Sequence, residues 1–248
     1  MRTERFLKYC AWAVHFYTAA GAVTGIIALD LIARGNFHDA LIVMAVALFV
    51  DSTDGPLARR LNVEARLPFF DGSLLDNVVD YLTYVAVPVF FMLRAGIMTD
   101  DSAGLTVASF IMVASAYGFC RTDAKTADHY FRGFPSYWNL AAFYLFCLRL
   151  PFLANAGLLI ALAIMEFLPI KFIYPNRTEP LHRLTLTFAF VWAVVTALML
   201  PAVPAYNPLL LYTSLAFIVY YFALSFTLYF YPARFAPTHT GTPARRSA

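Results

Sequence analysis

The chain is poor in charge and in cysteine. Of its 248 residues, 13% are Asp, Glu, Lys or Arg, and the formal net charge is +3. That charged share is about half of what a soluble globular protein carries, and it excludes a disordered chain and a nucleic-acid-binding protein. The 3 cysteines, Cys10, Cys120 and Cys147, are far apart and form no CxxC pair. They exclude a disulfide-rich secreted scaffold and are typical of small buried apolar side chains.

Apolar residues are what the chain has in excess. They make up 61% of the sequence, and the mean hydropathy is +0.66. A soluble domain of this length could not bury so much apolar surface, whereas a lipid bilayer accepts it on every outward face. The composition therefore predicts an integral membrane protein.

Eight apolar stretches are long enough, at roughly 20 residues each, to cross the hydrocarbon core of a bilayer. They cover residues 10–32, 38–58, 73–96, 104–121, 135–150, 152–171, 182–202 and 207–231. We therefore predict an all-α, polytopic integral membrane protein with about eight transmembrane helices. Residues 1–231 are expected to form a single membrane-embedded domain. Residues 232–248, rich in Pro, Thr and Arg, are expected to form a disordered cytoplasmic tail.

The placement of basic residues predicts the orientation of these helices. Lys and Arg concentrate in the cytoplasmic loops of membrane proteins. With both termini in the cytoplasm, all but Arg34, Arg94 and Arg149 of the 18 Lys and Arg residues fall in cytoplasmic segments. An odd number of helices would move later loops to the wrong side, so we predict that both termini are cytoplasmic.

Four aspartates lie where charge is unexpected. Asp51 and Asp54 fall toward the end of the second predicted helix, and Asp76 and Asp80 fall in the first turns of the third. Spacings of three and four residues place each pair on one helix face. Because the two helices are consecutive, the four carboxylates can converge at one depth.

Four such carboxylates would repel one another strongly unless cations neutralised them. Ligation by oxygen alone suits Mg²⁺ or Mn²⁺, and two such ions would neutralise a diphosphate and activate an attacking hydroxyl. Structural roles are the alternative: Asp76 could cap a helix with Ser73, and Asp54 or Asp80 could pair with Arg59 or Arg60. Acids inside membrane segments are costly and usually functional, which disfavours a structural role for all four.

The aspartates belong to a longer motif. Written out, it reads Asp51-x-x-Asp54-Gly55-x-x-Ala58-Arg59, twelve residues, then Gly72-x-x-x-Asp76-x-x-x-Asp80. This motif resembles the signature of the CDP-alcohol phosphotransferase family, although the gap between Arg59 and Gly72 is longer than usual there. The resemblance implies a membrane enzyme, often a homodimer, in which the aspartates bind two divalent cations, the cations hold the diphosphate of a CDP-linked substrate, and an acceptor hydroxyl displaces CMP.

The resemblance also implies roles for the single residues of the motif. It makes Asp51, Asp54, Asp76 and Asp80 metal ligands, with Asp80 also the general base. It further implies a nucleotide site shaped by Gly55, Ala58, Arg59 and Gly72.

The long gap, the chain length and the segments 71–88 and 122–146 resemble one bacterial branch of the family. That branch transfers the phosphatidyl group of CDP-diacylglycerol to choline, which implies a cytoplasmic membrane enzyme whose active site faces the cytoplasm. Serine, inositol or glycerol phosphate is the alternative acceptor.

Two functions outside the family are also alternatives. A membrane scaffold would tolerate loss of the aspartates. A cation transporter would also need intramembrane acids, but it does not explain Gly55, Ala58, Arg59 and Gly72 at fixed offsets.

A choline site should offer aromatic faces to the quaternary ammonium. Tyr81 and Tyr84 follow Asp80, and Tyr137 and Trp138 open the fifth predicted helix, so these four are the candidates. Tyrosine and tryptophan are also ordinary residues of the membrane interface, which is the alternative reading.

A basic cluster lies in the loop between the fourth and fifth predicted helices. It comprises Arg121, Lys125 and Arg132, with His129 among them. These residues could contact anionic lipid or the substrate diphosphate, or they could only set the topology. An anionic acceptor would require such cations.

Overall fold

The computed structural model describes residues 2–175, 177–203 and 205–231, so the predicted tail at 232–248 lies outside the described residues. These residues form mainly helices: α1 (Arg2–Ala33), α2 (Phe37–Arg60), α3 (Val63–Arg66), α4 (Gly72–Asp80), a π-helical segment (Tyr81–Ala86), α5 (Val87–Arg94), α6 (Ser102–Cys120), α7 (Trp138–Leu148), α8 (Phe152–Phe167), α9 (His182–Met199), a 3₁₀ turn (Leu200–Ala202) and α10 (Pro208–Phe230). Two strands, β1 (Tyr130–Arg132) and β2 (Lys171–Ile173), complete the fold.

Every predicted apolar stretch coincides with a helix, but the count of eight spans is not confirmed. In the described part of the chain, six helices are long and apolar enough to cross a membrane: 3–33, 37–60, 72–94, 102–120, 182–202 and 208–230. The other two, α7 and α8, have 11 and 16 residues. At 1.5 Å per residue they reach about 17 and 24 Å, short of the roughly 30 Å of a bilayer core. Both are shortened because the chain turns between them, with Arg149 at a φ of 50° and Pro151 preceding α8.

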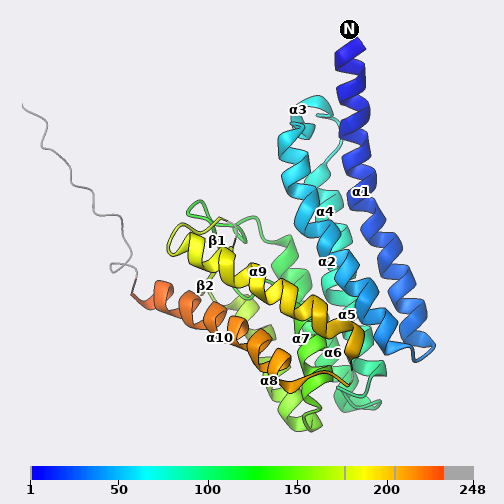
Figure 1. Ribbon diagram of the computed structural model, residues 1–248, viewed down its shortest axis with the longest axis vertical. Coiled ribbons are helices and arrows are strands. Elements are labelled where there is room, and N and C mark those ends of the chain that lie inside the picture. The colour runs from blue at the N-terminus through cyan, green and yellow to red at the C-terminus, as the bar shows by residue number, and fades with distance from the viewer. Residues whose placement is uncertain (1, 176, 204, 232–248) are drawn as a thin grey trace, which may run out of the picture.

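The third span packs closely against the first. It consists of α4, the π-helical segment and α5 in succession, and it packs along α1 and α2 (Figure 1). Gly21 of α1 allows this approach, because a Cβ there would lie 2.6 Å from Val79 Cγ1. The π-helical segment begins directly after Asp80 and contains Tyr84. A π-helical insertion changes the direction of the side chains that follow it and often marks a functional site.

The interior of the molecule lies where α5, α6, α7 and α8 meet. Its largest fully buried side chains include Phe91, Met92, Ile111, Trp138 and Leu159. Large apolar side chains on the outward faces, such as Leu153 at 82% exposed, remain accessible. Apolar residues both in the interior and on the outer surface of the protein are the pattern expected of helices surrounded by lipid.

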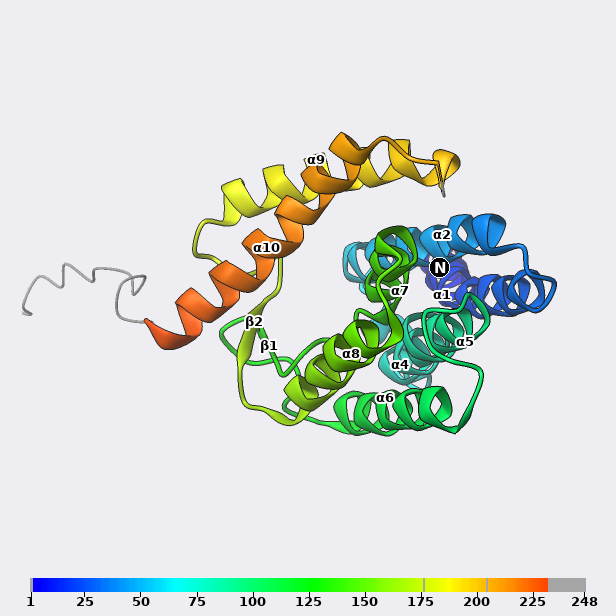
Figure 2. The ribbon, with the colours of Figure 1, turned by 90° about the horizontal axis from the view of Figure 1, so that it is seen from below.

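The small antiparallel sheet was not predicted from the sequence. It pairs Tyr130 with Ile173 and Arg132 with Lys171. Through this pairing, the loop before α7 is hydrogen-bonded to the segment after α8, and α10 packs against β2. In Figure 2, α9 and α10 form a hairpin set apart from the helices α1 to α6. The sheet therefore connects this hairpin to the rest of the molecule.

Candidate active site

Three of the four motif aspartates form a close group. Asp51 comes from α2, whereas Asp76 and Asp80 come from α4, and one carboxylate oxygen of each lies within 4.8 Å of the others. All three side chains are partly buried. Carboxylates so close together in a region of low dielectric need a cation between them, and a set of oxygen donors suits Mg²⁺ or Mn²⁺. The residues present therefore fit a divalent metal site.

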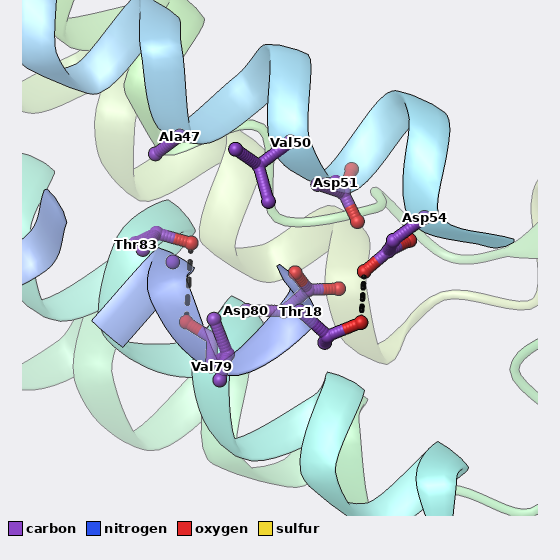
Figure 3. Close-up of a pocket in the computed structure, with 9 residues that line it drawn as sticks. Thr18, Ala47, Val50, Asp51, Asp54, Val79, Asp80 and Thr83 are labelled. Atoms are coloured by element: carbon purple, nitrogen blue, oxygen red, sulfur yellow. Dashed lines mark hydrogen bonds between the residues drawn. The ribbon is translucent and has the colours of Figure 1, made fainter. Parts of the chain in front are cut away.

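Asp54 lies beside this group rather than within it. Its side chain is 5% exposed, and its Oδ2 accepts a hydrogen bond of 2.7 Å from Thr18 Oγ1 of α1. Figure 3 shows Asp51, Asp54 and Asp80 directed into one small cavity, which Thr18 also lines. The aspartates on the two helices therefore share one polar space, and α1 closes one side of it.

The structural alternatives for these aspartates find little support. Asp71, not Ser73, caps α4, because its Oδ1 accepts a hydrogen bond of 2.9 Å from the Leu74 amide. Asp76 thus lies beyond the first turn and is not a capping partner. Within the described residues, no ion pair joins Arg59 or Arg60 to an aspartate of the motif.

The small residues of the motif lie against neighbouring side chains. A Cβ on Gly72 would lie 2.7 Å from His15 Cε1, so a larger residue there would require the His15 ring of α1 to move. A Cβ on Gly55 would lie 3.2 Å from Nη1 of the exposed Arg59. Ala58 is partly buried against a small apolar cluster of α1 and α3. Their predicted contacts with a nucleotide stay predictions.

Two of the four aromatic candidates come together at the carboxylates. The Tyr84 hydroxyl donates a hydrogen bond of 2.5 Å to Asp51 Oδ2, and the ring centroids of Tyr84 and Tyr137 are 6.3 Å apart. Tyr137 is therefore next to the tyrosine that hydrogen-bonds to the close group of aspartates.

The other two aromatic candidates are bound to α6. The Tyr81 hydroxyl donates to the Met112 carbonyl at 3.0 Å, and the indole N–H of the fully buried Trp138 donates to Ser115 Oγ at 2.7 Å. The structure therefore does not bring Tyr81 and Trp138 to the aspartates.

Sequence reasoning missed two residues of this site. Thr18 binds Asp54 from α1, and Tyr221 of α10 stands 6.2 Å from Tyr137, centroid to centroid. The Tyr221 hydroxyl is buried and has no hydrogen-bond partner among the described residues. Neither residue belongs to a motif, so no pattern in the sequence points to them.

The basic cluster is divided by an acidic residue. Asp123 accepts hydrogen bonds from Arg121 Nε at 2.8 Å and from Arg132 Nη1 at 2.7 Å. The hydrogen bond from Arg121 and the charges of both arginines lower the pKa of Asp123 to about 2. Lys125 differs, since it forms no ion pair within the described residues. The two arginines thus hold the loop together through Asp123.

Comparisons with known proteins agree with this geometry. Residues 13–229 match the family CDP-alcohol phosphatidyltransferase. The chain is 37% identical to the phosphatidylcholine synthase of Legionella pneumophila over 231 residues, which cover 90% of each chain. It is 38% identical to that of Legionella bozemanae over 85% of this chain and 100% of the relative. It is 37% identical to that of Pseudomonas aeruginosa over 82% and 85% of the two chains.

Proposed function

Because the chain belongs to the CDP-alcohol phosphatidyltransferase family, we propose that it transfers the phosphatidyl group of CDP-diacylglycerol to choline, forming phosphatidylcholine and CMP. The membership confirms the resemblance drawn from the aspartate motif. The observation that carries the proposal is the close group of Asp51, Asp76 and Asp80, found in a chain similar over most of its length to phosphatidylcholine synthases.

The reaction assigns a task to each aspartate. Asp51, Asp54, Asp76 and Asp80 would hold two divalent cations, Mn²⁺ or Mg²⁺, which offset the charge of the diphosphate and of the departing CMP. Asp80 accepts the proton of the choline hydroxyl. The choline oxygen then bonds to the phosphorus that carries diacylglycerol, and the bond from that phosphorus to the CMP oxygen breaks. The Tyr84 hydroxyl keeps Asp51 in place through its hydrogen bond.

The nucleotide enters beside the small residues of the motif. Gly55, Ala58 and Gly72 keep side-chain bulk away from the helix faces that carry the aspartates, and Arg59 is exposed and can contact phosphate oxygens. Of the aromatic candidates, Tyr84 and Tyr137 carry the choline proposal, since Tyr84 hydrogen-bonds to Asp51 and the Tyr137 ring lies beside that of Tyr84. An anionic acceptor is less well supported, because Arg121 and Arg132 are already paired with Asp123.

The enzyme acts in a bacterial cytoplasmic membrane, with both termini and the aspartates toward the cytoplasm. An ion pair of 3.2 Å between Arg66 and Glu4 supports this orientation, because it places the start of α1 and the basic segment after α2 at the same end. In this arrangement α7 and α8 complete eight membrane segments as shorter helices. The diacylglycerol tails reach the lipid between helices, and the protein forms a homodimer.

Release of CMP from the purified protein tests the proposal. The reactions contain CDP-diacylglycerol and Mn²⁺, with choline, serine, inositol or glycerol 3-phosphate added separately. We expect release only with choline and its loss in EDTA. Release with a different acceptor would overturn the choline assignment but keep the aspartate chemistry. No release with any acceptor would overturn the assignment of the donor.

A further inference from the structure

Glu166 is a buried acid that the proposed reaction does not use. It lies near the end of the apolar helix α8, and its side chain is 1% exposed. A carboxyl group in such surroundings is costly unless its oxygens are hydrogen-bonded. Its presence therefore requires an explanation in the residues around it.

The carboxyl group joins three elements through one oxygen. Glu166 Oε1 accepts a hydrogen bond of 2.7 Å from Ser136 Oγ, in the turn before α7, and one of 3.0 Å from Ser115 Oγ of α6. Ser115 in turn accepts the 2.7 Å hydrogen bond from the Trp138 indole. All four side chains are buried. Together they form a continuous hydrogen-bonded chain from α6 through α8 to the start of α7.

This chain holds the two neighbours of Tyr137. Ser136 has a φ of 51°, a conformation that residues with a side chain rarely adopt and that persists only where the surroundings enforce it. Its hydroxyl is held by Glu166, and Trp138 is held through Ser115. The backbone adds a hydrogen bond of 3.1 Å from the Phe134 amide to the Met165 carbonyl. The position of the Tyr137 ring is therefore set on both sides by the hydrogen bonds of Glu166.

We infer that Glu166 is a positioning residue that holds Tyr137 against Tyr84 and Tyr221 and thereby sets the affinity for the quaternary ammonium of the acceptor. This inference rests on the proposed function. The ring centroids of Tyr84 and Tyr221 lie 6.3 and 6.2 Å from that of Tyr137, so a shift of the turn would change the spacing of all three faces. A cation binds such faces only within about 6 Å of a ring centroid.

The second oxygen of Glu166 suggests which substitution preserves this role. Oε2 has no hydrogen-bond partner among the described residues, and a Cβ built on Gly118 would lie 3.5 Å from it. Only Oε1 receives hydrogen bonds, and the carbonyl oxygen of a glutamine can receive the same two. Glu166→Gln should therefore keep the turn in place, whereas Glu166→Leu fills the space but accepts no hydrogen bond.

Steady-state kinetics with the full-length protein test the inference. For each variant, the KM of choline, the KM of CDP-diacylglycerol and kcat are measured from CMP release. We expect Glu166→Leu to raise the KM of choline about tenfold, because the loss of one hydrogen bond changes an equilibrium constant by about that factor. The KM of CDP-diacylglycerol and kcat should stay within about twofold of the wild type. Ser136→Ala should raise the KM of choline several-fold, and Glu166→Gln should remain within about twofold of the wild type.

Asn155→Ala is the matched control. Asn155 lies on the same helix, is 2% exposed, and donates hydrogen bonds to the carbonyls of Ile97 and Leu150, at the opposite end of α8. Its loss should lower the melting temperature without changing the KM of choline. An equal rise in that KM for Asn155→Ala, or equal rises in both KM values for Glu166→Leu, would show a merely structural role and overturn the inference.

Three further outcomes are decisive. If Glu166→Leu does not fold, Ser136→Ala decides, and an unchanged KM of choline in that variant overturns the inference. If the wild-type protein releases no CMP with choline, the proposed function fails, and this inference fails with it. Wild-type release with choline, together with an unaltered Glu166→Leu variant, would overturn the inference alone.

Discussion

Asp80 is the single residue whose replacement best separates the proposed chemistry from a structural role. Asp80→Asn keeps the shape of the side chain but removes the charge and the proton acceptor. We expect CMP release to fall by about a thousandfold, within the range for a lost general base. In the presence of EDTA the melting temperature should not decrease, because one of three neighbouring like charges is removed.

Asp71→Asn is the control for this substitution. Asp71 caps α4 outside the close group, and asparagine caps helices as well as aspartate does. This variant should therefore keep both activity and stability. Activity above about a tenth of the wild type in Asp80→Asn would contradict its role as the general base.

The Tyr84 hydroxyl offers a second test at the scale of one atom. Tyr84→Phe keeps the ring and removes only the donor to Asp51 Oδ2. A hydrogen bond to a charged group contributes about 1.5–3 kcal/mol, so kcat/KM should fall roughly ten- to hundredfold. Tyr17→Phe removes a phenol that bonds Thr53 Oγ1 at 2.8 Å between α1 and α2, and it should change kcat/KM little. Equal losses in the two variants would indicate a general effect on helix packing.

Sequence reasoning succeeds for residues whose neighbours are close in the chain. The spacing of Asp76 and Asp80 requires only a helix, and the structure places both in the group that also contains Asp51. Thr18 and Tyr221 reach the site through the packing of α1 and α10, which no local pattern specifies. The directions of the tyrosines after Asp80 depend on the π-helical segment, and hydropathy does not reveal such a segment.

Helices were easier to predict from the sequence than the connections between them. Each apolar stretch forms a helix, because burial in lipid favours it whatever the partner. The lengths of α7 and α8 depend instead on the turn at Arg149 and Pro151. The strands β1 and β2 have three residues each, too few for a recognisable alternation of apolar and polar residues.

The loop between α6 and β1 gives a prediction about pH. Asp123 has a pKa lowered from 3.8 to about 2, chiefly by the hydrogen bond from Arg121. A carboxyl group with a depressed pKa stabilises the folded loop fully above its unfolded pKa, and that contribution is lost as the pH falls through the folded pKa. The loop amides of the wild-type protein should therefore be more protected against hydrogen exchange than those of the Asp123→Asn variant. Above about pH 4 the ratio of the two protection factors should be constant.

Below that pH the difference between the two proteins should shrink as the pH falls through about 2, and it should vanish at about pH 1. The measurement is hydrogen exchange by mass spectrometry on peptides covering 121–132, with peptides of α8 as the internal reference. A difference that grows as the pH falls would have the wrong sign and would exclude the proposed pairing of Asp123 with Arg121 and Arg132.

Elements from both ends of the described part of the chain contribute to the site. Thr18 comes from the first helix, the aspartates from α2 and α4, Tyr137 from the turn before α7 and Tyr221 from α10. The hairpin of α9 and α10 stands apart in Figure 2, yet Tyr221 brings it to the aromatic faces beside Asp51. The single catalytic domain over residues 1–231 stays a prediction, and the family match extends over residues 13–229.

The orientation of the molecule in the membrane can be tested with two exposed positions. Glu64 precedes the span 72–94 and Asp100 follows it, so the two lie on opposite sides if that segment crosses the bilayer. Single cysteines are placed at these positions in a chain whose Cys10, Cys120 and Cys147 are replaced by alanine, and each variant is first checked for CMP release. Because basic segments stay in the cytoplasm, a membrane-impermeant maleimide should label Glu64→Cys only in inverted vesicles and Asp100→Cys only in intact spheroplasts. The reverse pattern would place the aspartates toward the outside, where no cytoplasmic supply of a CDP-linked donor could reach them, and labelling of both positions from one side would show that residues 72–94 do not span the membrane.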